Sequence, residues 1–365
     1  FEIVTDNTAD LFEGYYDENP TRRLPFSFTL EDHFYEKDDE YPIELFYEKL
    51  KAGKLVKTSQ INPHDAEVMF EQVLQEGKDL LYIGFSSGMS GSFDNISYIA
   101  KGLRIKYPDR KIIVVDTLAG AGGEGLLVYY AKKMQNEGKS MEEIAEWVEN
   151  HKLNAHHCFI VSDLINLRNS GRISTLAALF GMIVHINPVL ELTTQGKIGI
   201  VTKSIGRKKS ISEMVKFFKT NYVKDDNDFI LIGHTNCPEE AHAFGAQIEQ
   251  LSGGIPVKYG YINRLVSGCA GYNALAVFFR AKQEFKRAIW RDTSSGTTCL
   301  KITYAYVRWF LIQAVPFLSD AQISRLNVYL LTECAISKTE REPQGGEKAS
   351  VELDGKYKRL RRLGA

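Results

Sequence analysis

The stretch KIIVVDTLAGAGGEGLLVYYA, from Lys111 to Ala131, decides between two α/β folds. A strand is expected over residues 112–115, and a helical pattern follows the glycines. Gly120, Gly122 and Gly125 satisfy G-x-G-x-x-G, the fingerprint of dinucleotide-binding folds. That fingerprint needs its turn directly at the strand end, and later a strand with an acidic residue. Here the four residues Asp116–Ala119 lie between the expected strand and the first glycine. The segment SMEEIAEWVENH then predicts a second helix, where the fingerprint needs a strand. We therefore favour a structural strand-to-helix turn.

Short apolar strands alternate with amphipathic helices on both sides of this stretch. Ser140 is expected to cap the second helix, with Glu143 completing a capping box. The alternation predicts a parallel sheet with helices on its faces, over residues 1–152. The expected strands before and within this region are FEIVTD, DLLYIGF and KIIVVD, and the helices between them are PIELFYEKLKAG, NPHDAEVMFEQVLQEG and SGSFDNISYIAKGLRIKY.

Beyond about residue 150 the pattern changes to hairpin-like strand neighbours, with Gln195 and Gly196 supplying one turn. We expect a second α/β domain with a mixed sheet over residues 153–285. Its expected strands are CFIVSDLINL, HINPVLEL, KIGIVTKS, DFILIGHT and VKYGYIN, and its expected helices are Ser174–Phe180, Ser210–Asn221 and Glu239–Gln250. Residues 286–365 form an atypical basic C-terminal extension.

The charge distribution argues against nucleic acid as a partner. The net charge is −1, but residues 286–365 hold 14 Lys and Arg against 8 Asp and Glu, so residues 1–285 carry −7. A weak contact between the basic extension and a membrane surface is a possibility that this charge leaves open. Five scattered cysteines, no secretory signal and no bilayer-spanning run predict a cytoplasmic protein. Neither a cofactor nor a metal site is expected.

The loop Ser86–Ser92 holds four serines and two glycines in seven residues, directly before a helix. Serine hydroxyls and free N–H groups at a helix start bind anions, so we favour a ligand-binding loop over a simple cap. The hydroxyl cluster Lys57–Gln60 is expected in a loop. His156 and His157 are expected before a strand, in a structural role. No nucleophile and base pattern is present, so an enzyme is not expected.

The chain from Phe1 to about Phe285 resembles the DegV family of bacterial fatty-acid-binding proteins. The similar segments occur in the family's order, which makes the resemblance specific. They are IVTDNTADL, KTSQINP at Lys57–Pro63, SSGMSGSFDN at Ser86–Asn95, VVDTLAGAGGEG, LRNSGRIS at Leu167–Ser174, and INPVLELTTQGKI followed by SIGRKKS.

The resemblance implies two α/β domains that hold a long-chain fatty acid in a tunnel between them. It further implies that a separate, ATP-dependent fatty acid kinase phosphorylates the carboxylate to give an acyl phosphate. Carried onto this chain, Thr58 and Ser90 would bind the carboxylate, together with the N–H of Gly91. Arg172 and Arg207 would face the partner kinase or the phosphate. Ordinary solvated surface charge explains the two arginines equally well.

Two departures from the family pattern are visible. The family's G-x-H-T-G-P-G segment is replaced by SGCAGYNALAVFF, Ser267–Phe279, which places Cys269 at the position of a histidine. Residues 286–365 have no counterpart in the family. Two alternatives therefore remain: an enzyme that binds a phosphorylated metabolite at Ser86–Ser92, or a degenerate lipid-binding module that is not phosphorylated. The apolar run Leu176–Ile186 is expected to form either tunnel wall or ordinary core.

Overall fold

The computed structural model describes residues 1–37, 40–162, 164–172 and 187–281. They belong to a compact unit that extends from Phe1 to Glu284. Three expectations fall outside the described residues: the helix over 174–180, the apolar run over 176–186 and the extension over 286–365.

The first sheet is parallel, as the alternating pattern predicts, and it contains the three expected strands and a fourth, short edge strand that was not expected. β6 lies in its interior and is buried at every position, because helices cover both faces of the sheet. In spatial order the strands are β2 (Arg22–Leu24), β1 (Glu2–Asp6), β6 (Leu80–Gly84) and β7 (Ile112–Asp116).

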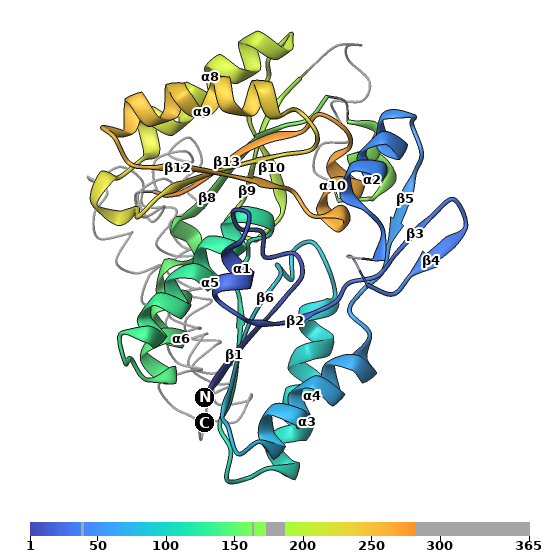
Figure 1. Ribbon diagram of the computed structural model, residues 1–365, viewed down its shortest axis with the longest axis vertical. Helices are drawn as coiled ribbons and strands as arrows, with labels where there is room; N and C mark the ends of the chain where they lie inside the picture. The colour runs from blue at the N-terminus through green and yellow to red at the C-terminus, as the bar shows by residue number, and fades with distance from the viewer. Residues whose placement is uncertain (38–39, 163, 173–186, 282–365) are drawn as a thin grey trace, which may run out of the picture. The chain divides into compact units, whose positions relative to one another are not determined.

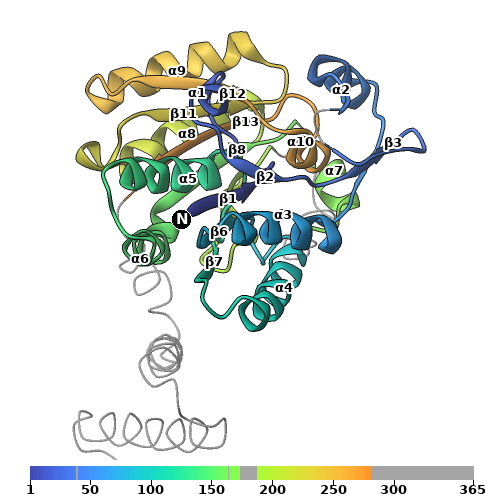
Figure 2. The same cartoon turned by 60° about the horizontal axis from the view of Figure 1, so that its bottom comes forward.

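Two helix pairs cover the two faces of this sheet (Figure 2). α3 (Pro63–Gln75) and α4 (Ser92–Lys106) share one apolar core with it, and α5 (Ala121–Asn136) and α6 (Met141–His151) share another. Ser140 and Glu143 form the expected capping box at the start of α6. Among the described residues, no helix is both long enough and apolar enough to cross a bilayer.

The second sheet is mixed and contains six strands, which confirms the expected fold class. Only β11 and β12 pair in parallel; the remaining neighbours are antiparallel. In spatial order the strands are β10 (Ile198–Thr202), β9 (Val189–Leu192), β8 (Ala155–Ile160), β13 (Leu275–Arg280), β11 (Ile230–His234) and β12 (Val257–Tyr261). α8 (Arg207–Asn221) and α9 (Pro238–Ser252) lie along one side of it (Figure 1).

The glycine-rich helix α5 packs between the two sheets. Leu127 and Val128 belong to the core of the first sheet, whereas Leu126 belongs to a core shared with β11 and β13. A Cβ atom added at Gly122 would lie 2.3 Å from a ring carbon of Phe278, and every residue from 121 to 128 is buried. The glycines thus let a helix approach a sheet closely, which supports the structural turn over a nucleotide site.

A small third sheet carries the hydroxyl cluster toward the other two sheets. It consists of β4 (His33–Tyr35), β3 (Phe28–Leu30) and β5 (Val56–Thr58), and α2 (Ile43–Lys51) packs on it. The prediction of a loop over Lys57–Gln60 is therefore wrong for Lys57 and Thr58, because both residues pair with β3. Isolated three-residue strands carry too little periodicity to be seen in a sequence.

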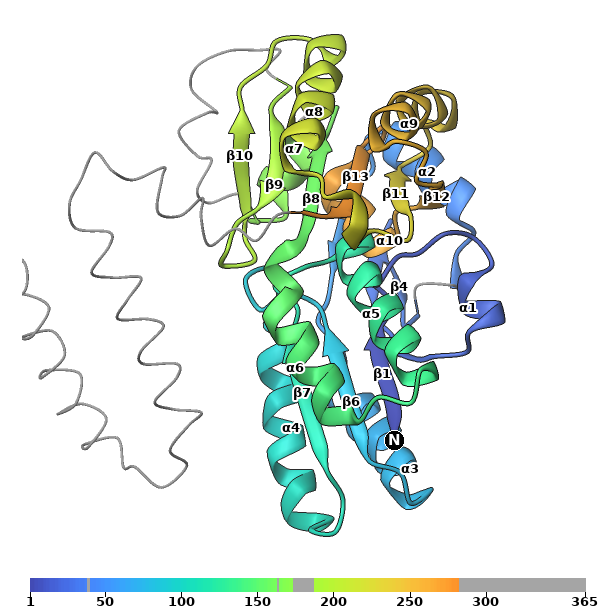
Figure 3. The same cartoon turned by 90° about the vertical axis from the view of Figure 1, so that its left-hand side faces the viewer.

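Two further expectations need correction, and one strand was not expected. CFIVSDLINL is not one strand: β8 ends at Ile160, and α7 (Ile165–Asn169) follows (Figure 3). His156 and His157 lie within β8 rather than before it. β13 was not expected at all, because LAVFFR follows a turn-rich segment and shows no alternation. The remaining short elements are α1 (Tyr15–Glu18), α10 (Arg264–Ala270) and the 3₁₀ turns η2 (Lys152–Asn154) and η4 (Lys224–Asp226).

Candidate functional site

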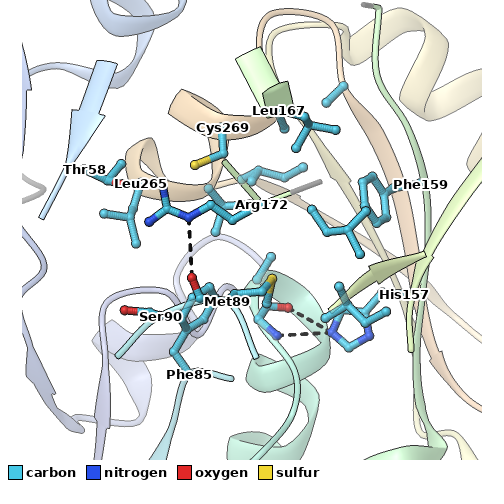
Figure 4. A pocket seen from close by; sticks show the side chains of 18 of the residues that line it. Thr58, Phe85, Met89, Ser90, His157, Phe159, Leu167, Arg172, Leu265 and Cys269 are labelled. Carbon is cyan, nitrogen blue, oxygen red and sulfur yellow. Dashed lines mark hydrogen bonds between the residues drawn. The ribbon is translucent and has the colours of Figure 1, made fainter. Parts of the chain in front are cut away.

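An apolar cavity lies where the first sheet, the second sheet and α10 meet (Figure 4). Its unfilled volume is about 850 Å³, including the part that opens to solvent. The walls come from all three parts of the fold, and include Phe85, Phe159, Leu192, Leu265 and Phe278.

One end of this cavity is polar. Thr58, Ser90, Arg172 and Cys269 lie on one side of it, and His157 and Phe159 lie on the other (Figure 4). A second, polar chamber adjoins the first at this end. The two chambers share Thr58, Ser59, Met89, Ser90 and Arg172.

Side-chain hydrogen bonds join the two hydroxyl-bearing segments that form the polar end. The amide of Asn95 on α4 donates to Gln60 Oε1 at 2.8 Å. The N–H of Ile61 donates to Ser92 Oγ at 3.1 Å. These bonds hold the end of β5 against the loop before α4, and so bring Thr58 and Ser90 to one cavity.

The arrangement leaves hydroxyl donors for a ligand. Ser92 Oγ lies 3.0 Å from Ser90 Oγ and accepts the N–H of Ile61, and either of the two hydroxyls can donate to the other. When Ser92 is the donor, the Ser90 proton can bind an anion in the cavity. Gly91 directly precedes α4, where unpaired N–H groups and the helix dipole favour a negative charge. This geometry suits a carboxylate.

The two predicted arginines lie in different places. Arg172 lines both chambers, where Nη1 donates to the carbonyl of Ser170 at 2.6 Å. Arg207 lines neither chamber, and its Nε donates to Glu240 at 2.9 Å and 2.8 Å. The structure therefore does not bring Arg207 to the polar end of the cavity, and a role for it in partner docking stays a prediction.

Cys269 lies at the polar end, beside Thr58 and Ser90, the residues that are predicted to bind a carboxylate. Burial raises the pKa of the Cys269 thiol, against smaller opposing effects of the Arg172 guanidinium and of hydrogen bonds with Ser170 and Thr58. The protonated thiol is a weak donor, unlike a histidine. Cys269 thus stands where the family resemblance expects a histidine, and it supplies no positive charge there.

His157 is neutral at the other end of the cavity. Burial lowers its pKa to about 4, and its ring nitrogen Nε2 lies 3.3 Å from the N–H and 3.1 Å from the carbonyl of Gly120. A neutral, backbone-bonded imidazole adds little polarity to the wall. The expected structural role of His157 therefore agrees with these contacts, although its place in a cavity wall was not foreseen.

Asp6, the last residue of β1, does not line the cavity but contacts one of its walls. Asp6 accepts hydrogen bonds from Tyr82 at 2.9 Å and from the N–H of Phe85 at 3.0 Å, and Phe85 is a cavity wall. The single proton of the Thr8 hydroxyl cannot serve both carboxyl groups that it contacts, those of Asp6 and Glu124. Glu124, with fewer donors around it, is the member that carries a proton.

Glu124→Gln is expected to reduce the pH dependence of folding. Burial and the nearby charge of Asp6 raise the pKa of Glu124 well above its ordinary value. The folded state therefore keeps a proton that the unfolded state has lost, so this contribution to stability falls as pH rises above the unfolded pKa of about 4.3. The neutral amide removes that dependence.

Urea unfolding of parent and variant between about pH 5 and pH 8 checks this expectation. The stability of Glu124→Gln relative to the parent should rise with pH. The control is Glu142→Gln, since a bond from Lys111 lowers the pKa of the exposed Glu142 carboxyl. Parallel profiles for the parent and Glu124→Gln would show that Glu124 is ionised when folded.

The first serine of the Ser86–Ser92 loop does not face the cavity. Ser86 is buried, and its Oγ donates to the carbonyl of Gly196 at 2.8 Å. Within the described ranges, no group of three or more His, Cys, Asp or Glu side chains could hold a metal ion. The cavity-lining residues that the sequence did not indicate include Leu265, Lys197 and Phe278, which only the tertiary fold brings to the site.

Comparison with known proteins gives one consistent result. The sequence model of the DegV family, described as uncharacterised proteins, matches residues 1–282. A DegV domain-containing protein of Clostridium perfringens is 34% identical over 281 residues, which are 76% of this chain and 97% of that protein.

Solved structures share the fold. A fatty-acid-binding DegV family protein from Thermus thermophilus is 24% identical, with a TM-score of 0.68 over 77% of this chain and 99% of that one. A stearic acid-binding protein from Eubacterium ventriosum is 20% identical, with a TM-score of 0.69 over 76% and 97% of the two chains.

Proposed function

The chain belongs to the DegV family, and on that premise we propose that it binds a long-chain fatty acid and presents the carboxylate to a partner kinase. The observation that carries the proposal is an apolar cavity with one polar end, where Thr58, Ser90 and Arg172 converge. The fatty-acid-binding proteins with the same fold support it.

The energetics favour such a carrier. Burial of methylene groups contributes about 0.8 kcal/mol each, so a 16-carbon chain offers over ~10 kcal/mol before the costs of ordering. The affinity then comes mainly from the apolar walls. The polar end needs only to satisfy one carboxylate and to set the direction of the chain.

The kinase step follows from where the carboxylate would lie. Thr58 and Ser90 line the polar chamber as well as the apolar one, so the carboxylate would face the polar chamber. Among the described residues that line this end, Cys269 carries its proton and Arg172 is cationic, so neither of the two acts as a base. A separate, ATP-dependent fatty acid kinase would therefore supply the phosphoryl group, and the chain acts as carrier rather than enzyme.

Native mass spectrometry of the purified protein, followed by lipid extraction, tests the proposal. We expect one fatty acid per chain, released on denaturation. A phosphorylated metabolite at the same stoichiometry would favour the enzyme alternative. A protein that stays empty after incubation with several long-chain fatty acids would contradict the proposal.

A further inference from the structure

We propose that His157 and Leu192 form the end wall of the apolar cavity, and that the side chain of Leu192 sets the longest acyl chain that the protein binds. The inference rests on the proposed function, because it concerns the methyl end of the fatty acid whose carboxylate lies at the polar end. Its new content is a limit on chain length and the side chain that imposes it.

The apolar cavity adjoins a small outer pocket as well as the polar chamber. The outer pocket has an unfilled volume of about 260 Å³, including the part that opens to solvent. Among the described residues, only His157 and Leu192 line both the cavity and the outer pocket, and none lines both the polar chamber and the outer pocket. His157 also lies across the cavity from Thr58 and Ser90 (Figure 4). These two side chains therefore close the cavity at the end away from the carboxylate.

His157 is the rigid half of this wall. Its ring contacts the backbone of Gly120 and lies edge-on to the ring of Phe278, with 5.6 Å between the ring centroids. A Cβ atom added at Gly123 of α5 would lie 1.9 Å from Nε2 of His157. Because the imidazole is enclosed by helix backbone and an aromatic ring, it cannot turn aside for a longer chain.

Leu192 is the half whose size a substitution can change. It is the last residue of β9, and it pairs with Ile198 of β10, which also lines the cavity. This pairing fixes the backbone of Leu192. The side chain is only partly buried and packs at the margin of a small core. A shorter side chain here therefore enlarges the cavity without removing a fully buried core residue.

The lining of the outer pocket is largely polar. Lys152, His156 and Thr193 are among its residues. An added methylene is worth about fourfold in affinity, or about 0.8 kcal/mol, only while apolar surface receives it. Beyond Leu192 a methyl group would meet polar groups and water instead. Affinity should therefore rise with chain length up to a limit and then stop rising.

Saturated fatty acids of about 12 to 20 carbons test this limit, with affinities measured by displacement of a fluorescent fatty acid. The parent should gain about fourfold for each methylene up to its limit and nothing beyond it. Leu192→Ala removes the branched end of the side chain, so its limit should lie about two methylenes further. Leu192→Phe should shorten the limit by a similar amount. The limit is read from affinity ratios within each variant, so a uniform loss of affinity does not imitate a shift.

Leu153→Ala is the matched control, because Leu153 lines the outer pocket and not the cavity. It should keep the limit of the parent. One limit shared by the parent, Leu192→Ala and Leu192→Phe would overturn the inference, and so would an equal shift in Leu153→Ala and Leu192→Ala. A parent whose affinity rises up to the longest acid also overturns it. A parent that binds none of the acids contradicts the proposed function itself.

Discussion

Gly125→Ala is expected to cost about 3 kcal/mol or more of folding free energy, out of the 5–15 kcal/mol of a typical protein. A Cβ atom at Gly125 would lie 1.8 Å from the backbone carbonyl oxygen of Asp10, and 2.7 Å from its carbonyl carbon. Backbone cannot swing aside as a flexible side chain does. Because α5 packs between the two sheets, its displacement disturbs both cores at once.

The matched control is Gly102→Ala, another glycine-to-alanine change within a helix. Nothing lies within 4 Å of a Cβ atom at Gly102, so this variant should gain about 0.5–1 kcal/mol from helix propensity. Urea unfolding followed by circular dichroism measures both variants. Gly125→Ala with parent-like stability would show that α5 can move away from Asp10 at little cost.

The helix α5 shows why the sequence predicted the fold class but not the packing between the two sheets. The strand at Ile112–Asp116, the glycines and the following helix were all predicted, because each has a local signature. That α5 lies between two sheets was not predictable. The reason for Gly122 and Gly125 is the proximity of Phe278 and Asp10, which are more than 100 residues away in sequence.

The candidate site was likewise predicted only in part. Thr58, Ser90 and Gly91 were named through segments similar to a known family, and the structure brings all three to one end of the site. Composition and periodicity alone would not have paired them, since Thr58 lies in a three-residue strand. Lys197 was missed because a lysine after a Gln-Gly turn is indistinguishable from ordinary surface charge.

Thr58→Ala and Ser90→Ala are each expected to weaken fatty-acid binding by about one to two decades. Each hydroxyl would donate a charge-assisted hydrogen bond worth roughly 1.5–3 kcal/mol to the carboxylate. The acyl chain keeps its apolar contacts, so binding weakens and is not abolished. Thr29→Ala and Ser97→Ala are the controls, because these residues lie on the neighbouring strand and in α4 and line neither chamber.

The methyl ester of the same fatty acid isolates the part that the hydroxyls play, because it keeps the chain and removes the negative charge. Without the anion, the donors of Thr58 and Ser90 lose most of their contribution. The affinity ratio of free acid to methyl ester therefore measures the polar end of the site alone.

The most direct test of the account is this ratio, measured for the parent, Thr58→Ala and Ser90→Ala by displacement of a fluorescent fatty acid. The account predicts a strong preference of the parent for the free acid, and a preference reduced about tenfold or more in either variant. An unchanged ratio in both variants would show that these hydroxyls do not bind the carboxylate, and would contradict the proposed orientation of the fatty acid.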